Sequence, residues 1–250
     1  MVKAIMNGCN GAMGRVITEI IAADEAIEIV AGVDMNTEAH AGYPVYQTLD
    51  ECPKADVVID FSVAKATDGV LAYCEATKTP LVLCTTGLSE EQLAHAAKLS
   101  ETSAVLRSAN MSVGINLLLK VLREVAPVLA DAGFDIEVLE KHHNRKLDAP
   151  SGTALALADA MNESLGNSYH YKYDRSSERV KRDKKEIGIQ AIRGGNIVGE
   201  HDIIFAGQDE VITFQHTAYS RAIFGKGAVQ AAKFLAGKGA GMYDMSDVIG

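Results

Sequence analysis

The chain has 250 residues, of which 48% are hydrophobic and 23% are charged, and its formal net charge is −9. This length allows one large core or two smaller ones, and the negative charge argues against a nucleic-acid partner, because a phosphate backbone would be repelled. No segment has the ~20 consecutive apolar residues of a membrane-spanning helix, and the N-terminus shows no secretory pattern. All four cysteines lie in the first third of the chain without a CxxC pair, which is typical of reduced thiols. We therefore expect a cytoplasmic protein with no membrane or nucleic-acid partner.

Short apolar runs alternate with helical patterns over the first hundred residues. The predicted strands are residues 3–6, 28–33, 56–61, 80–84 and 104–107, and the predicted helices are residues 13–23, 64–77 and 89–99. This alternation predicts an α/β domain of the Rossmann type, a doubly wound parallel sheet with helices on both faces. Such a sheet binds ligands outside the carboxyl ends of its strands.

The pattern changes after Asn110. We predict a long helix over 115–129, bent or shortened by Pro127, then a strand at 135–141, a helix at 151–165 and strands at 187–193, 197–205 and 211–218. This is typical of a second, smaller α+β domain with a mixed open sheet. We expect the tail, with a helix at 225–235, to pack back on the first domain, so that residues 1–112 and 222–250 form one domain and 113–221 the other. The charged stretch 175–186 is predicted to be a solvated loop rather than a binding patch.

A glycine-rich turn follows the first predicted strand and opens the first helix, with the sequence Gly8-Cys9-Asn10-Gly11-Ala12-Met13-Gly14. Glycines allow a sharp turn and a close approach of the backbone to a pyrophosphate, which the helix N-terminus attracts. Asn10 occupies the middle glycine position of the usual G-x-G-x-x-G pattern. The alternative is an ordinary tight turn, but Asp34, twenty residues further on, favours dinucleotide binding, because an acidic side chain there holds the adenosine ribose.

The nature of the cofactor depends on Asp34. A carboxylate at this position would repel the extra phosphate of NADP, and the following residues Met35, Asn36 and Thr37 offer no guanidinium to receive it. We therefore expect NADH to be favoured. NADPH is the alternative if a basic residue reaches this position from elsewhere in the fold.

A second motif crowds five basic or imidazole side chains into residues 141–146, before the run Pro-Ser-Gly-Thr at 150–153. Ser151 or Thr153 is suited to capping the following helix, and the N–H groups of Gly152 and Thr153 would attract a carboxylate. The alternatives are a metal site, a solvated basic loop and a plain helix start. Metal is disfavoured, because adjacent histidines rarely bind one ion together and no HExxH spacing or nearby cysteine supports it.

The run E-K-H-H-N-R-K-L-D-A-P-S-G-T-A at 140–154 resembles the signature of the dihydrodipicolinate reductase family. The resemblance covers essentially the whole chain and includes residues 8–15, 60–62, 85–87, 109–114, 193–201 and 220–221. The His-His segment and the Arg-Gly-Gly…Gly-Glu-His segment are specific, whereas the glycine turn is not. The departures are small: Cys84 stands where the family often has Gly, and Val63-Ala64 stand where a Pro is common.

The resemblance implies an oxidoreductase of lysine and diaminopimelate biosynthesis, in which NAD(P)H gives a hydride to a cyclic imine dicarboxylate and yields tetrahydrodipicolinate. His142 and Lys146 would be the catalytic pair, with Lys146 the direct proton donor and His142 its acid–base partner. The substrate carboxylates would be bound by His143, Lys146, Ser151, Gly152, Thr153 and Arg221. No metal is implied.

The resemblance also implies roles for the domains. The first would bind the cofactor through Gly8, Cys9, Asn10, Gly11, Ala12, Met13, Asp34, Cys84, Thr85, Thr86, Ser108, Ala109, Asn110 and Met111. The second would bind the substrate and join a homotetramer through its sheet. Hinges near 112–114 and 220–222 would let the domains close and exclude water.

Two other functions are compatible with a nicotinamide-binding chain. Another imino-acid dehydrogenase would keep the glycine turn but has little reason for the His-His…Lys…Pro-Ser-Gly-Thr run. An NADH-binding redox sensor needs no proton donor, so His142 and Lys146 argue against it. The sequence does not distinguish reduction of the hydroxylated ring with loss of water from reduction of an already dehydrated ring.

Overall fold

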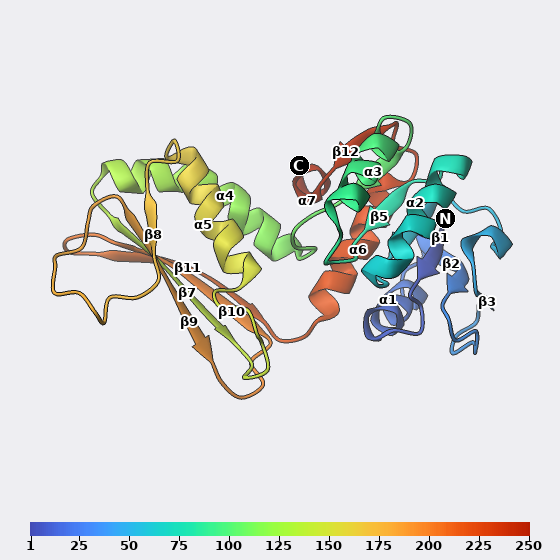
Figure 1. The fold of residues 1–250 in the computed structure, drawn as a ribbon, viewed down its shortest axis with the longest axis horizontal. Coiled ribbons are helices and arrows are strands. Elements are labelled where there is room, and N and C mark those ends of the chain that lie inside the picture. Colours follow the sequence, from blue (N-terminus) through green and yellow to red (C-terminus); the bar gives the residue numbers. More distant parts are fainter. The chain divides into compact units, whose positions relative to one another are not determined.

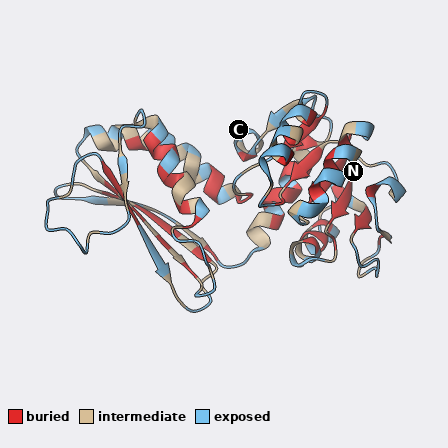
Figure 2. Ribbon diagram, in the orientation of Figure 1, coloured by how far each residue is buried: buried red, intermediate tan, exposed pale blue.

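The computed structural model describes all residues from Met1 to Gly250. The chain divides into two compact units, one formed by Met1–Val113 with Ala222–Gly250 and the other by Gly114–Arg221 (Figure 1). Each unit has its own sheet and its own buried core (Figure 2). No helix is long and apolar enough to cross a membrane.

The first unit contains a seven-stranded sheet with the order β12-β6-β5-β4-β1-β2-β3. Its strands are β1 (Val2–Asn7), β2 (Ile27–Val33), β3 (Val45–Tyr46), β4 (Val57–Asp60), β5 (Leu81–Leu83), β6 (Ala104–Leu106) and β12 (Gly241–Tyr243). All neighbouring strands are parallel. The order 3-2-1-4-5-6 within it is that of a Rossmann sheet, so the predicted fold class is confirmed for this unit.

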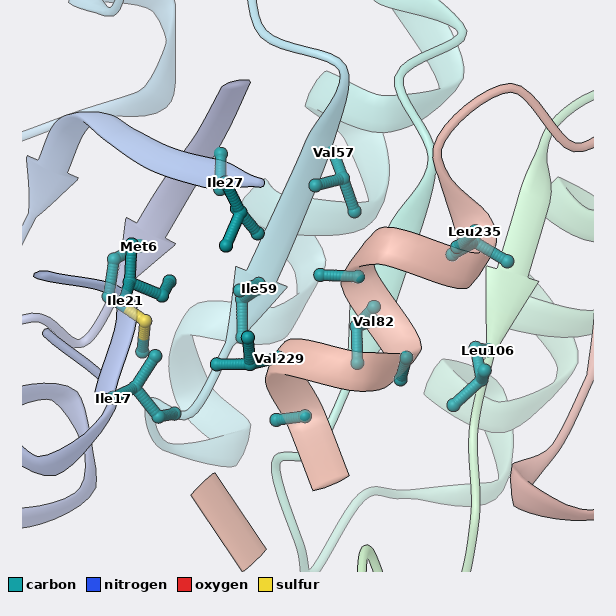
Figure 3. Packing of buried hydrophobic residues seen from close by; sticks show 14 of the residues in the cluster. Met6, Ile17, Ile21, Ile27, Val57, Ile59, Val82, Leu106, Val229 and Leu235 are labelled. Atoms are coloured by element: carbon teal, nitrogen blue, oxygen red, sulfur yellow. The ribbon is translucent and has the colours of Figure 1, made fainter. Parts of the chain in front are cut away.

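Helices cover both faces of this sheet because residues on each strand alternate between two cores. The helices are α1 (Ala12–Ala22), α2 (Ala64–Thr77), α3 (Glu90–Ser100), α6 (Ala222–Leu235) and α7 (Met245–Ile249), with a 3₁₀ turn at Leu49–Glu51. Met6 of β1 packs in the core with α1 and α6, whereas the adjacent Ile5 packs in the core with α2 and α3. Figure 3 shows Val229 of α6 close to Ile59 in the first of these cores.

The second unit has a five-stranded mixed sheet with the order β11-β10-β7-β9-β8. Its elements are α4 (Val113–Asp131), β7 (Asp135–His142), α5 (Gly152–Ser164), β8 (His170–Lys172), β9 (Glu186–Arg193), β10 (Gly199–Ala206) and β11 (Val211–Ala218). The helices α4 and α5 pack on one face, on a core that includes Val138, Ile203 and Phe205. Along β7 buried residues alternate with half-buried ones. Glu140 and His142 therefore point to the helix side, and Leu139 and Lys141 to the open face.

The structure refines two sequence predictions. The helix predicted over 115–129 is α4, which spans Val113–Asp131, so Pro127 does not shorten it. The charged stretch is a largely exposed loop, as predicted. Within it, the guanidinium of Arg182 donates to the carboxylates of Asp135 and Glu137 and to the carbonyls of Ile136, Asp183 and Glu186. These bonds fasten the loop to the sheet.

Candidate functional site

The glycine turn after β1 requires glycine for steric reasons. Gly8 has a φ of +80°, and a Cβ there would lie 2.5 Å from the carbonyl oxygen of Phe61. A Cβ on Gly14 would lie 2.2 Å from the carbonyl oxygen of Gly8. Gly11 begins α1 without a side-chain cap, and the first-turn N–H groups of a helix have no partner within the helix. The turn is therefore suited to a phosphate group at the positive end of the helix dipole.

Asn10, at the middle position of the turn, fastens the loop that follows β2. Its backbone N–H donates to the Asp34 carboxylate at 3.0 Å, and its amide nitrogen donates to the carbonyls of Asn36 and Glu38 at 2.6 and 3.1 Å. Its amide oxygen lies 2.7 Å from Nδ1 of His40. The sequence gives no sign of these contacts, which hold Asp34 beside the glycine turn.

A buried carboxylate connects three strand ends. Asp60, at the end of β4, accepts hydrogen bonds from Asn7 Nδ2 at 2.7 Å, from Ser62 Oγ at 2.6 Å and from Thr85 Oγ1 at 2.7 Å. Asn7 ends β1, and Thr85 follows β5. Thr85 is a predicted cofactor residue, whereas Asp60 was not assigned a role.

The other predicted cofactor residues follow β5 and β6, which end at the same edge of the sheet as β1 and β2. They are Cys84, Thr86, Ser108, Ala109, Asn110 and Met111. Cys9 is fully buried in the core, and burial together with Asp34 raises the pKa of its thiol to about 11. Cys9 therefore contributes to the turn through its backbone, and its thiol remains protonated.

In the second unit, Glu140 lies at the centre of a buried polar cluster. This side chain is 0% exposed, and its carboxylate accepts from Arg193 Nη1 and Nη2 at 2.7 and 2.6 Å and from the Ser151 N–H at 2.8 Å. Nδ1 of His142 lies 2.7 Å from the same carboxylate. Burial alone would raise the pKa of Glu140, but the Arg193, His142 and Ser151 donors outweigh it and lower the pKa. The carboxylate is therefore ionised at neutral pH.

Two more histidines follow His142 across the sheet. The His142 and His201 ring centroids are 5.3 Å apart, and those of His201 and His216 are 6.5 Å apart. Burial, and then the neighbouring His142, lower the pKa of His201 to about 4, so His201 is neutral at pH 7. Its Nε2 lies 3.1 Å from Ser151 Oγ, which also accepts the Ala154 N–H as the cap of α5. The backbone N–H and the hydroxyl of Ser151 are thus both hydrogen-bonded within the protein.

Basic side chains gather at the N-terminus of α5. Burial lowers the pKa of His143, and the nearby cations Arg145 and Arg221 lower it further. Lys146 Nζ lies 2.9 Å from Asp148 Oδ1. The pKa of Asp148 is lowered by this hydrogen bond and, to a smaller extent, by the Gly152 N–H. The helix N-terminus and these cations are suited to an anionic ligand, although the chain as a whole is acidic.

The structure thus collects the predicted site residues into two groups, one in each unit. Glu140, Arg193 and His201 lie in segments that carry the family resemblance, but sequence reasoning gave them no role. The signal that could have found them is the alternation along β7 and β9, which places polar residues on the helix-facing side of two strands at one end of the sheet.

Comparison with known proteins identifies the relatives of both units. Residues 2–111 match the family model of the dihydrodipicolinate reductase N-terminus, and residues 114–249 match that of the C-terminus. The chain is 50% identical over 250 residues to the 4-hydroxy-tetrahydrodipicolinate reductase of Caldanaerobacter subterraneus subsp. tengcongensis, covering 100% of this chain and 98% of the relative. It is 47% identical to the reductase of the same name from Clostridium tetani, covering 98% and 96%.

The fold resembles that of a dipicolinate-bound dihydrodipicolinate reductase from Paenisporosarcina sp. TG-14. The TM-score is 0.79 with 23% identity, and the match covers 98% of this chain and 97% of the other. The DAP dehydrogenase of C. glutamicum in complex with DAP matches with a TM-score of 0.54 and 12% identity over 100% of this chain and 95% of the other. At these identities the two structures establish the two-unit architecture alone.

Proposed function

The chain belongs to the dihydrodipicolinate reductase family, and on this premise we propose that its His142–Lys146 segment carries out the proton transfer of a reduction in which NADH is the preferred cofactor. It is an oxidoreductase that uses a nicotinamide nucleotide and reduces a cyclic imine dicarboxylate to tetrahydrodipicolinate, as a 4-hydroxy-tetrahydrodipicolinate reductase of lysine and diaminopimelate biosynthesis. One observation carries the proposal. Basic side chains and the first N–H groups of α5 lie near the imidazole of His142, which Glu140 orients through Nδ1.

The first unit fits a dinucleotide. A side chain at Gly8 or Gly14 would fill the turn, and the N-terminus of α1 is oriented to hold the pyrophosphate. When bound, the reduced nicotinamide supplies the hydride. An ionised carboxylate can accept about four hydrogen bonds. The Asp34 carboxylate already accepts two, from the backbone N–H groups of Asn10 and Asn36. Asp34 therefore keeps capacity for the adenosine ribose hydroxyls, and its charge disfavours the 2′-phosphate of NADPH.

The substrate has two carboxylates, which need cationic or N–H partners. We assign them to His143, Lys146, Arg221 and the N–H groups of Gly152 and Thr153. Lys146 is paired with Asp148 in this structure, so a substrate carboxylate competes with an internal one for the same ammonium. Ser151 supports this site indirectly, because its polar groups hold Glu140, His201 and α5.

Hydride addition to a conjugated ring leaves electron density that a proton must quench. The Lys146 ammonium donates this proton, and His142 is its acid–base partner, with Nδ1 bonded to Glu140 and Nε2 on the other side of the ring. An imidazole suits this role because its ordinary pKa is close to neutral pH.

The open face of the five-stranded sheet is the surface through which we expect four copies to assemble. Neither α4 nor α5 covers this face, which carries Leu139, Ile192, Ile204 and Val211 along four adjacent strands. Ile192 is 46% exposed and Val211 is 62% exposed, and burying such side chains favours association. We place the assembled homotetramer in the cytoplasm.

The test is oxidation of NADH, and separately of NADPH, with substrate made in situ from pyruvate and aspartate semialdehyde by the preceding synthase. We expect oxidation of the reduced cofactor to depend on the synthase and to be faster with NADH than with NADPH. Folded protein that binds NADH but turns over nothing would instead indicate a sensor or a different imino-acid substrate. Light scattering of the same preparation gives the oligomeric state.

A further inference from the structure

Glu140 has the position of a residue that acts on the reaction through its neighbour. We propose that Glu140 is a positioning residue, which fixes His142 in the tautomer with its proton on Nδ1 and so leaves Nε2 as the nitrogen that exchanges protons. This inference rests on the proposed function, because it concerns the same site.

The first support is the number of donors that Glu140 accepts. A carboxylate removed from water is costly unless its oxygens are hydrogen-bonded, and here two donors from Arg193, the Ser151 N–H and His142 Nδ1 satisfy it. An ionised carboxylate only accepts hydrogen bonds. The 2.7 Å contact therefore requires the proton to lie on Nδ1 of His142.

The second support is the set of elements that these bonds join. Glu140 and His142 lie on β7, Arg193 ends the neighbouring β9, and Ser151 caps α5. Arg193 also donates to the carbonyl of Asp148 at 2.7 Å, in the loop that carries Lys146. The buried carboxylate therefore fixes the histidine relative to the helix N-terminus and the loop at which we place the substrate.

The third support is the space around Nε2. A Cβ on Gly199, at the start of β10, would lie 3.1 Å from Nε2 of His142, which is tighter than nine in ten real Cβ contacts. A side chain at this position would therefore crowd the nitrogen to which we assign proton exchange. His201 does not replace Glu140 as the orienting group, because its Nε2 is engaged with Ser151 Oγ and its Nδ1 has no hydrogen-bond partner.

A purely structural ion pair between β7 and β9 is the competing explanation. The tautomer of His142 tests the orientation itself, and the activity of a Glu140 variant separates the two explanations. Protein with histidine as the only ¹⁵N-labelled residue gives tautomers directly by magic-angle-spinning NMR, and the His142→Gln variant identifies the signals by their loss. Wild-type His142 with its proton on Nδ1 at pH 8 is the expected result. A proton on Nε2 in the wild type would overturn the proposal without any variant.

The activity arm uses Glu140→Gln, which removes the charge while keeping the shape. The new amide can also donate to Nδ1, so the proton moves in part to Nε2. We expect kcat to fall at least about 10- to 100-fold, the range given by partners that orient a functional histidine, while KM for the dicarboxylate and Kd for NADH stay within about twofold. The matched control is Glu186→Gln, because Glu186 is also buried and paired with an arginine, Arg175, but lies at the opposite end of β9. Its kcat should stay near that of the wild type.

Each outcome decides the proposal. Equal losses of kcat in both variants, or an unchanged kcat in Glu140→Gln, would show that Glu140 is only structural. If Glu140→Gln fails to fold, Arg193→Lys tests the same point, because it keeps the charge but loses the two-pronged geometry that fixes the carboxylate. A wild-type chain without reductase activity but with the Nδ1–H tautomer would reject the proposed function and leave the positioning intact.

Discussion

Replacing Asp34 by asparagine should shift cofactor preference toward NADPH. The Asp34 carboxylate accepts the Asn10 and Asn36 N–H groups at 3.0 and 3.3 Å, and an amide oxygen at the same place keeps one acceptor while it removes the charge. Two like charges about 4 Å apart repel by ~1–4 kcal/mol at effective dielectric constants between 80 and 20. Because the loop is partly exposed, we take ~1–2 kcal/mol, which corresponds to ~5- to 30-fold in relative affinity.

The assay is kcat/KM with NADH and with NADPH, combined with Kd values from cofactor fluorescence. Glu38→Gln is the matched control, since it removes one negative charge from the same loop while its carbonyl, which accepts from Asn10, stays in place. An Asp34→Asn preference that stays within twofold of the wild type, or a control that shifts as far, would refute the role given to Asp34.

Three further perturbations test other parts of the account. Gly8→Ala should weaken NADH binding at least ~10-fold in a fluorescence titration, because the added Cβ would lie 2.5 Å from a carbonyl oxygen and the φ of +80° is unfavourable for alanine. An unchanged affinity for NADH would contradict this expectation. Asp148→Asn should lower KM for the dicarboxylate ~2- to 5-fold, the size of a partly exposed ion pair, because Lys146 loses its internal partner; a raised KM would show instead that Asp148 helps to place Lys146. In the folded chain the pKa of His201 is about 4, below its ordinary value of 6.5. As pH falls, the unfolded chain therefore binds the proton at a higher pH than the folded chain does. The contribution of His201 to the free energy of unfolding is fully present above pH ~6.5 and is lost as pH falls toward 4. Urea unfolding should show a loss of about 2 kcal/mol between pH 7 and pH 5 from this group, and His201→Gln should remove that part of the loss; an equal loss in the variant would contradict it.

Local patterns in the sequence were sufficient to predict the longer helices and strands. The helix α2 was predicted with both ends correct, and the strand–helix alternation predicted the parallel sheet of the first unit. The elements that escaped prediction are β3, β8, β12, the 3₁₀ turn and α7, none longer than five residues. Segments this short contain too few residues for a period to appear, and their pairing with distant strands decides their conformation.

The polar cluster of the second unit escaped for a related reason. His142 lies opposite Arg193 only because β7 and β9 pair in parallel in that register, and a one-residue slip would turn Arg193 to the other face. Asn10 is similar, since its contacts with the loop after β2 join residues 24 to 30 positions apart. Residue types in the motifs indicated the chemistry, whereas the bonds that orient the side chains depend on tertiary packing.

The central claim is that chemistry and cofactor binding are carried by different residues, and the most direct test compares His142→Ala and Lys146→Ala with the wild type. The measurement is kcat in the synthase-coupled assay together with Kd for NADH from fluorescence on the same protein. We predict that each variant loses at least ~100-fold in kcat, as expected for removal of a proton-transfer group, with Kd for NADH within about twofold. Normal turnover in both variants, or loss of NADH binding in either, would show that the site has been assigned to the wrong residues.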